Sequence, residues 1–346
     1  EVGRRISALI EREMRDKVIP ALSIALVDDQ QTVWAAGFGE EDPATHRQAD
    51  ATTVYRVGSV SKLFTDIGVM QLVERGEVDL DAPIARYLPD FRPRNPSGKA
   101  ITLRQLMSHY SGLVREPPAG HYFDDRGTTL AATVASLNQT ALVYPPETRR
   151  KYSNAAIAVV GYLLERHSGR PFPAYLAEAV LQPLGLASSA FDPRPELVAR
   201  LAKGQMWTLH GRTFDAPGFQ LGMAPAGSMY STMPDLARFM SALFAGGRGA
   251  GGSVLQAATL EAMWQPQYAP RGARRGAGIG FVVGALEGRR TVSHGGAIYG
   301  FVTQLTALPD EKLGVAVSAA RDGLNALTAR IPDEALRLML AARAQR

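Results

Sequence analysis

The chain has 346 residues, of which 46% are hydrophobic and 21% are charged, a composition that indicates a folded protein with a large core and excludes disordered and collagen-like classes. Its net charge of +5 is spread over short basic clusters, so we expect no nucleic-acid interface, and no apolar run is long enough to span a membrane. The absence of cysteine excludes disulfides, thiolate metal sites and cysteine nucleophiles.

The beginning of the chain predicts one helix followed by a β-hairpin. Apolar residues between Ile6 and Met14 recur at helical spacing. Two β-rich runs follow, Ala21–Val27 and Thr32–Gly37, and the polar residues 28–31 between them are typical of a turn. This segment therefore predicts a helix that leads into two neighbouring strands.

The middle of the chain predicts helices, and the last third returns to strands. The helices that we expect between residues 59 and 244 cover Ser59–Arg75, Thr102–His109, Asn154–His167 and Thr232–Phe244. Two later helices are expected at Ala257–Met263 and Pro332–Arg343. Between them lie the β-type runs Gly280–Ala285, Arg290–Ser293, Phe301–Ala307 and Leu313–Ala319.

Strands at both ends of the chain, with helices between them, predict an α/β (α+β) fold whose sheet is assembled from the two termini. Residues 1–55 and 245–346 would form the sheet lobe, and residues 56–244 would form an inserted, mainly helical lobe. A cleft between two lobes is a common place for a substrate pocket. We therefore expect a single catalytic unit with its active site between the lobes.

The first candidate motif is Ser59-Val60-Ser61-Lys62, at the start of a predicted helix. Residues three positions apart share a helix face, so Lys62 is expected beside the Ser59 hydroxyl. A serine becomes a strong nucleophile when a neighbouring base takes its proton, and a lysine can be that base when burial lowers its pKa. The motif alone is weak evidence, because a solvated helix lysine explains Lys62 equally well.

The second motif is Tyr152-Ser153-Asn154, just before another predicted helix. A phenol held near a lysine ammonium can be pushed toward phenolate and act as a general base. Asn154 offers donors and an acceptor, which suit either a substrate amide or Lys62. A half-buried tyrosine and a helix-capping asparagine are the structural alternative.

The third motif is His294-Gly295-Gly296-Ala297, at the end of a predicted strand. Two glycines let a substrate approach the backbone closely, and exposed N–H groups can stabilise an oxyanion. His294 would add a hydrogen bond or a positive charge, although a lone histidine is more often structural. The three motifs together are strong evidence for a hydrolytic site.

The combination resembles the class C β-lactamase-like superfamily of serine hydrolases, which includes class C β-lactamases, D,D-peptidases or penicillin-binding proteins, D-aminopeptidases and family-eight carboxylesterases. The resemblance extends over nearly the whole chain and includes the stretches 55–58, 76–83, 106–113, 182–185 and 226–228. It implies a β-lactamase/transpeptidase-like fold, with an antiparallel sheet, flanking helices and an inserted helical lobe.

The resemblance also implies a role for each motif residue. Ser59 would be the acylated nucleophile, and Lys62 and Tyr152 would share the base role and return a proton to the leaving group. Asn154 would contact the substrate and Lys62. The backbone N–H groups of Ser59 and Ala297 would form the oxyanion hole. The strand residues His294, Gly295, Gly296 and Ala297 would bind the substrate, with His294 where the family often has lysine.

The third motif departs from that of class C β-lactamases, which resemble this chain but have lysine–threonine–glycine there, with a lysine that helps to hold the β-lactam carboxylate. We therefore expect a carboxylesterase of short-chain esters with at most weak β-lactamase activity. Two alternatives stay open: a D,D-peptidase or D-aminopeptidase-like penicillin-binding protein or β-lactamase, and a non-catalytic binding module on the same scaffold. We expect a small-molecule ester or amide substrate, no cofactor, no metal and no membrane span, and the resemblance favours a periplasmic or secreted location.

Overall fold

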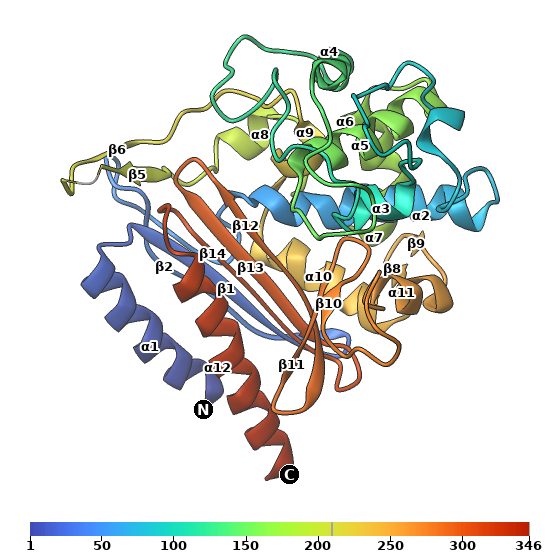
Figure 1. The fold of residues 1–346 in the computed structure, drawn as a ribbon. Helices are drawn as coiled ribbons and strands as arrows, with labels where there is room; N and C mark the ends of the chain where they lie inside the picture. Colours follow the sequence, from blue (N-terminus) through green and yellow to red (C-terminus); the bar gives the residue numbers. More distant parts are fainter. Residues whose placement is uncertain (209, 346) are drawn as a thin grey trace.

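The first and last strands of the chain lie side by side in the middle of the sheet. The computed structural model describes residues 1–208 and 210–345. In it, β1 (Ala21–Asp28) and β14 (Leu313–Ala319) are apolar and buried over nearly their whole length and pair antiparallel. A strand that is apolar on both sides needs cover on both faces of its sheet. The prediction that the sheet is built from both termini is therefore confirmed (Figure 1).

The main sheet in the described part of the chain has eight strands, all antiparallel to their neighbours, in the order β10-β11-β12-β13-β14-β1-β2-β3. The remaining strands of this sheet are β2 (Gln31–Asp42), β3 (Arg47–Gln48), β10 (Gly276–Ala277), β11 (Val282–Leu286), β12 (Arg289–Ile298) and β13 (Phe301–Leu308). The strand predicted over Arg290–Ser293 is thus too short. β12 continues through the third motif because its glycines pair with β13, Gly295 opposite Gln304.

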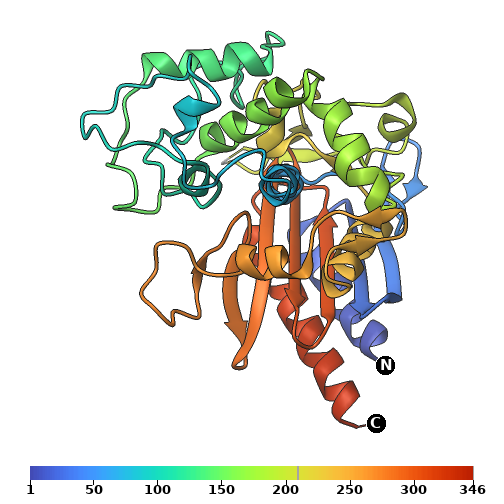
Figure 2. The same ribbon diagram turned by 90° about the vertical axis from the view of Figure 1, so that its right-hand side faces the viewer.

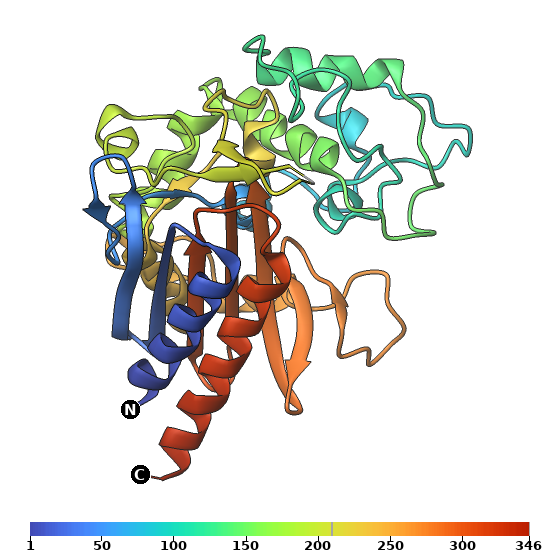
Figure 3. The ribbon, with the colours of Figure 1, turned by 90° about the vertical axis from the view of Figure 1, so that its left-hand side faces the viewer.

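Two helices from opposite ends of the chain cover one face of the sheet. α1 (Val2–Lys17) and α12 (Asn325–Ala344) lie side by side there (Figure 3). The predicted start of the last helix at Pro332 is wrong by seven residues. Proline favours the first turn of a helix because it lacks an N–H, but here Pro332 lies inside the helix. Buried Leu327 and Ile331 in the preceding turns pack into the same core as α1, which stabilises the earlier start.

The opposite face is covered by α10 (Met233–Phe244), which contacts β1 and β14. Its start was predicted correctly, because the Thr232 side chain accepts a hydrogen bond from the N–H of Asp235 and so caps the helix. The neighbouring α11 (Ala257–Met263) matches its prediction residue for residue.

The helical region lies beyond one end of the sheet, and α2 (Ser61–Glu74) runs between the two (Figure 2). α2 packs against α5 (Asn154–Ser168), and both helices are buried over most of their length, as their nearly continuous apolar sequences require. The other helices of this region are α3 (Leu103–Met107), α4 (Leu130–Ser136), α6 (Phe172–Leu176), α7 (Gln182–Leu184), α8 (Pro195–Val198) and α9 (Ala224–Gly227).

Short two-stranded pairings connect this region to the sheet: β4 (Tyr55–Arg56) with β7 (Tyr230–Ser231), β5 (Gln205–Trp207) with β6 (Thr213–Asp215), and β8 (Arg248–Gly249) with β9 (Gly252–Ser253). Within the described ranges, none of the helices combines the length and the apolar character needed to cross a bilayer. The division into lobes at residues 55 and 245 stays a prediction.

Candidate active site

Ser59 lies in a tight turn between β4 and α2. The helix predicted from Ser59 begins two residues later, after a 3-10 turn over Gly58–Val60. Gly58 has a φ of +53°, and a Cβ there would lie 2.7 Å from the backbone nitrogen of Ala297. The Ser61 hydroxyl donates to the Gly58 carbonyl (2.6 Å) and accepts from the N–H of Met229 (3.0 Å). The turn that carries Ser59 is therefore fixed from both sides.

Lys62 is fully buried directly beside this turn. Its Nζ donates to the Ser59 Oγ (2.9 Å) and to the carbonyl of Ala226 (2.6 Å). Burial lowers the pKa of Lys62 to about 7, with nearby Glu116 and Asp66 opposing the shift. A large share of Lys62 is thus a neutral amine near pH 7, within hydrogen-bonding distance of the serine proton.

Tyr152 lies against the same amine. The centroid of its ring is 5.0 Å from the Lys62 Nζ and 4.3 Å from the ring centroid of His109. Burial raises the pKa of Tyr152 to about 12, and its interaction with Ser59 opposes the rise. The phenol is therefore neutral at pH 7, in contrast to the expected shift toward phenolate.

His109 is a neighbour of the site that belongs to none of the three motifs. It is buried, its ring stacks on Tyr152, and its Nδ1 accepts from the N–H of Ser153 (3.2 Å). Burial lowers its pKa well below the ordinary value, so the ring stays neutral. His109 thus holds the segment that carries Tyr152 in place.

Asn154, the first residue of α5, makes its side-chain hydrogen bond to a group other than Lys62. Its Nδ2 donates to Oε1 of Glu116 (2.7 Å), and the hydrogen bonds of Lys62 within the described ranges do not include Asn154. A carboxylate is a strong acceptor, because hydrogen bonds to ionised groups are stronger than those between neutral groups. Glu116 belongs to no recognised motif, so the sequence carried no signal for it.

The third motif lies along the Ser59 turn. A Cβ at Gly296 would lie 2.0 Å from the carbonyl oxygen of Val57, so only glycine fits at this crossing. At Gly295 the nearest atom would be the flexible end of the Gln304 side chain, at 2.8 Å. Gly296 therefore lets β12 approach the nucleophile turn, a different reason from the substrate approach that the sequence suggested.

His294, in the same strand, is buried and uncharged. Its Nδ1 donates to the carbonyl of Gly295 (2.6 Å), and burial, reinforced by the charge of Lys62, lowers its pKa to about 3. Of the two roles that the sequence allowed, a hydrogen bond and a positive charge, only the hydrogen bond remains at neutral pH. With Nδ1 donating, the neutral ring presents Nε2 as an acceptor.

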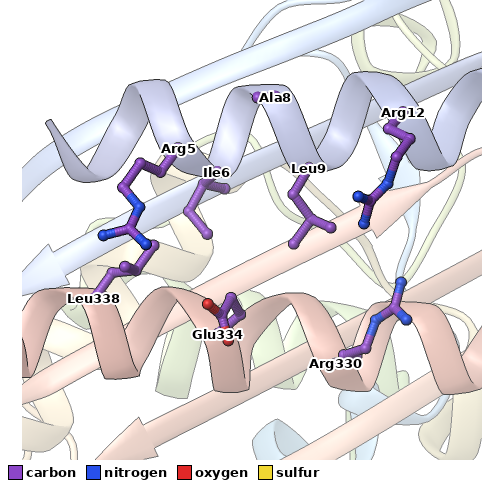
Figure 4. A pocket seen from close by; sticks show the side chains of 8 residues that line it. All are labelled: Arg5, Ile6, Ala8, Leu9, Arg12, Arg330, Glu334 and Leu338. Atoms are coloured by element: carbon purple, nitrogen blue, oxygen red, sulfur yellow. The ribbon is translucent and has the colours of Figure 1, made fainter.

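A separate hollow of about 450 Å³ lies between α1 and α12 (Figure 4). It is lined by Arg5, Ile6, Ala8, Leu9, Arg12, Arg330, Glu334 and Leu338. These residues all belong to the two helices on the far face of the sheet, so the hollow shares no residue with the Ser59 site.

Residues 6–338 match the family model described as beta-lactamase. Among curated relatives, the human putative beta-lactamase-like 1 is 30% identical over 352 residues, covering 97% of this chain and 68% of that protein. Esterase EstB of Burkholderia gladioli is 29% identical and covers 70% of each chain. The chain spans 44% of the length of Beta-lactamase-like protein 2 of Dictyostelium discoideum and 70% of the length of EstB.

Two solved structures share the fold over almost the whole chain. The octameric penicillin-binding protein homologue from Pyrococcus abyssi superimposes with a TM-score of 0.84 at 26% identity, covering 99% of this chain and 78% of that one. D-amino acid amidase from Ochrobactrum anthropi SV3 superimposes with a TM-score of 0.83 at 22% identity, covering 99% of both chains. The expected fold, a large antiparallel sheet with flanking helices, is confirmed.

Proposed function

Because the chain belongs to the beta-lactamase family and is at that level a serine hydrolase, we propose that it is a carboxylesterase of short-chain esters that works through an acyl-enzyme on Ser59. The observation that carries the proposal is the buried pair of Ser59 and Lys62, with Nζ and Oγ 2.9 Å apart. An amine whose pKa is about 7 is suited to general-base catalysis at neutral pH.

In the proposed reaction, the Ser59 Oγ attacks the ester carbonyl carbon while its proton passes to the Lys62 Nζ. The charge that develops on the carbonyl oxygen is stabilised by the N–H groups of Ser59 and Ala297. The C–O bond to the alcohol then breaks, and the alkoxide receives a proton from Lys62 by way of the Tyr152 hydroxyl. A water molecule, deprotonated in the same way, releases the acid and restores Ser59.

The neutral His294 supports an ester over a β-lactam as the preferred substrate. A β-lactam antibiotic carries a carboxylate, which a cation at this position would attract. Burial holds the pKa of His294 near 3, so the strand offers no charge there at pH 7. The binding of a neutral short-chain ester does not depend on such a charge.

The proposal is tested by intact-mass spectrometry of the protein after parallel incubation with p-nitrophenyl butyrate, a penicillin and a D-alanyl peptide. We expect a burst of p-nitrophenol, transient acylation at Ser59 and continued turnover with the ester, and slow or weak acylation by the penicillin. A long-lived penicilloyl adduct with negligible ester turnover would instead favour a penicillin-binding protein. Absence of any adduct would favour the non-catalytic module.

Glu116 supports a second candidate function, hydrolysis of amides or esters of D-amino acids. Its Oε1 pairs with Asn154 and Arg115, but its Oε2 has no hydrogen-bond partner among the described residues. A substrate with a free ammonium group beside its scissile carbonyl would supply that partner. The structural similarity to D-amino acid amidase is in keeping with this candidate.

Glu116→Gln separates the two candidates. If Glu116 binds a substrate ammonium, kcat/KM for a D-alanine p-nitroanilide should fall about tenfold or more, the effect of losing one charged hydrogen bond. Hydrolysis of p-nitrophenyl butyrate should stay within about twofold at pH 8.5, where Lys62 is neutral in both proteins. Exposed Glu178→Gln is the matched control. Equal losses on both substrates would contradict an ammonium-binding role.

A further inference from the structure

Asp66 is a buried acid that the proposed mechanism does not use. It lies on α2 four residues after Lys62, is 0% exposed, and neither of its oxygens has a hydrogen-bond partner among the described residues. An unpartnered buried carboxyl group costs stability whether or not it is charged. A stabilising role therefore does not explain why this acid lies beside the proposed base.

The groups described around Asp66 do not offset the cost of burying its carboxyl group with a hydrogen bond. A Cβ at Gly280 would lie 2.8 Å from Oδ2, so the carboxyl group packs directly on that backbone, with Leu63 alongside. The Gly280 N–H is already engaged with the carbonyl of Met107 (3.2 Å). Burial raises the pKa of Asp66 well above its ordinary value, and Lys62 is the one charged group that opposes this rise.

Asp66 and Lys62 each affect the protonation state of the other, because both lie on α2. Residues four apart lie on the same face, with Cβ atoms about 5–6 Å apart. The hydrogen bonds of the Lys62 Nζ go to Ser59 and Ala226, so Asp66 acts on the amine through space. Both side chains are 0% exposed, and charges in buried surroundings interact more strongly than charges in water. A carboxylate at Asp66 favours the ammonium form of Lys62, and a protonated Asp66 favours the neutral amine.

We propose that Asp66 is a positioning residue that acts through Lys62: its carboxyl group sets the pH at which Lys62 gives up its proton and becomes the base for Ser59. This inference rests on the proposed function of Lys62. The proton involved leaves Nζ for solvent, so Asp66 touches neither the substrate nor the reacting serine.

The test is the rate of covalent labelling of Ser59 by a fluorophosphonate, followed by intact mass across pH 5 to 9 in the unaltered chain, Asp66→Asn and Asp66→Leu. Neither replacement can carry a negative charge, so the acidic limb of the rate should move to lower pH by about one unit in both. At pH 9 the rates should agree within about twofold. The other ionisable groups around Lys62 stay unchanged in these variants: Tyr152, His109, His294, Arg115 and Glu116.

Asp235→Asn is the matched control. Asp235 is also a buried aspartate (1% exposed), but its carboxylate accepts from the Ser188 N–H (2.8 Å), the Ser189 hydroxyl (2.8 Å) and Arg238 (2.7 Å). Its replacement should lower the melting temperature and leave the acidic limb in place. Asp66→Leu should raise the melting temperature, because it replaces an unpaired polar group in the core with an apolar side chain.

The outcomes distinguish this inference from the proposed function. Labelling of Ser59 with the same acidic limb in the unaltered chain, Asp66→Asn and Asp66→Leu would overturn the inference and leave the proposed function intact. A change in melting temperature alone would likewise give Asp66 a structural role only. If Ser59 is not labelled in the unaltered chain at any pH, both the inference about Asp66 and the proposed function are wrong.

Discussion

Ser59→Ala is expected to abolish covalent labelling by a fluorophosphonate and to reduce ester hydrolysis by about 10⁴-fold or more, because the acyl-enzyme cannot form without the hydroxyl. The Lys62 Nζ would lose one of its two hydrogen-bond acceptors and keep the other, the Ala226 carbonyl. The turn itself is held by Ser61, so the fold should survive. Intact mass with the fluorophosphonate and p-nitrophenol release with the ester measure the two effects.

Ser168→Ala is a suitable control for this variant. Ser168 ends α5, and its hydroxyl donates to the carbonyl of Leu164 within the same helix (2.7 Å). Its replacement should leave both labelling and turnover unchanged. Labelling that persists in Ser59→Ala would place the nucleophile elsewhere and end the proposed assignment.

The fold was predictable from the sequence where the residues of a single segment determine the structure of that segment. The apolar character of β1 and β14, the spacing in α1 and the cap of α10 are all local, and the structure confirms them. Two of the boundaries that the sequence misplaced, those of β12 and α12, depend on distant partners. β12 extends because β13 pairs with its glycines, and α12 starts early because its first turns pack into the core shared with α1.

The residues of the site likewise divide into those placed by local spacing and those placed by distant segments. Ser59 and Lys62 are three residues apart, so their contact follows from helical geometry. Glu116 and His109 carry no spacing signal, because their surroundings come from segments far away in the chain. Asp66 lies one helical turn after Lys62, but its burial against Gly280 depends on a distant segment. Protonation states were hardest to predict. Burial sets the pKa of Tyr152 and His294, and burial depends on the whole fold.

Lys62→Met is the second variant with a large expected effect. The side chain stays unbranched, becomes one atom shorter and loses its amine, so ester hydrolysis and Ser59 labelling should each fall by about 10²-fold or more. The pH profile should change as well. The neutral amine is the active form and its pKa is about 7, so the rate in the unaltered chain should rise with pH through about 7 and then level off. In Lys62→Met this rise should be absent.

The stability of Lys62→Met should separate loss of the base from loss of the fold. Burial lowers the pKa of Lys62 from 10.5 to about 7, so between these values the unfolded chain binds more protons than the folded one. The stability of the unaltered chain therefore rises with pH across this window, and the low-pH side carries the full cost of the buried charge. Methionine removes that cost, so Lys62→Met should melt at a higher temperature at pH 7, with a difference that shrinks toward pH 10. Lys99→Met, at an exposed position, should show neither effect. A near-normal rate in Lys62→Met would exclude the amine as the base, because no other change in this variant restores a proton acceptor beside Ser59.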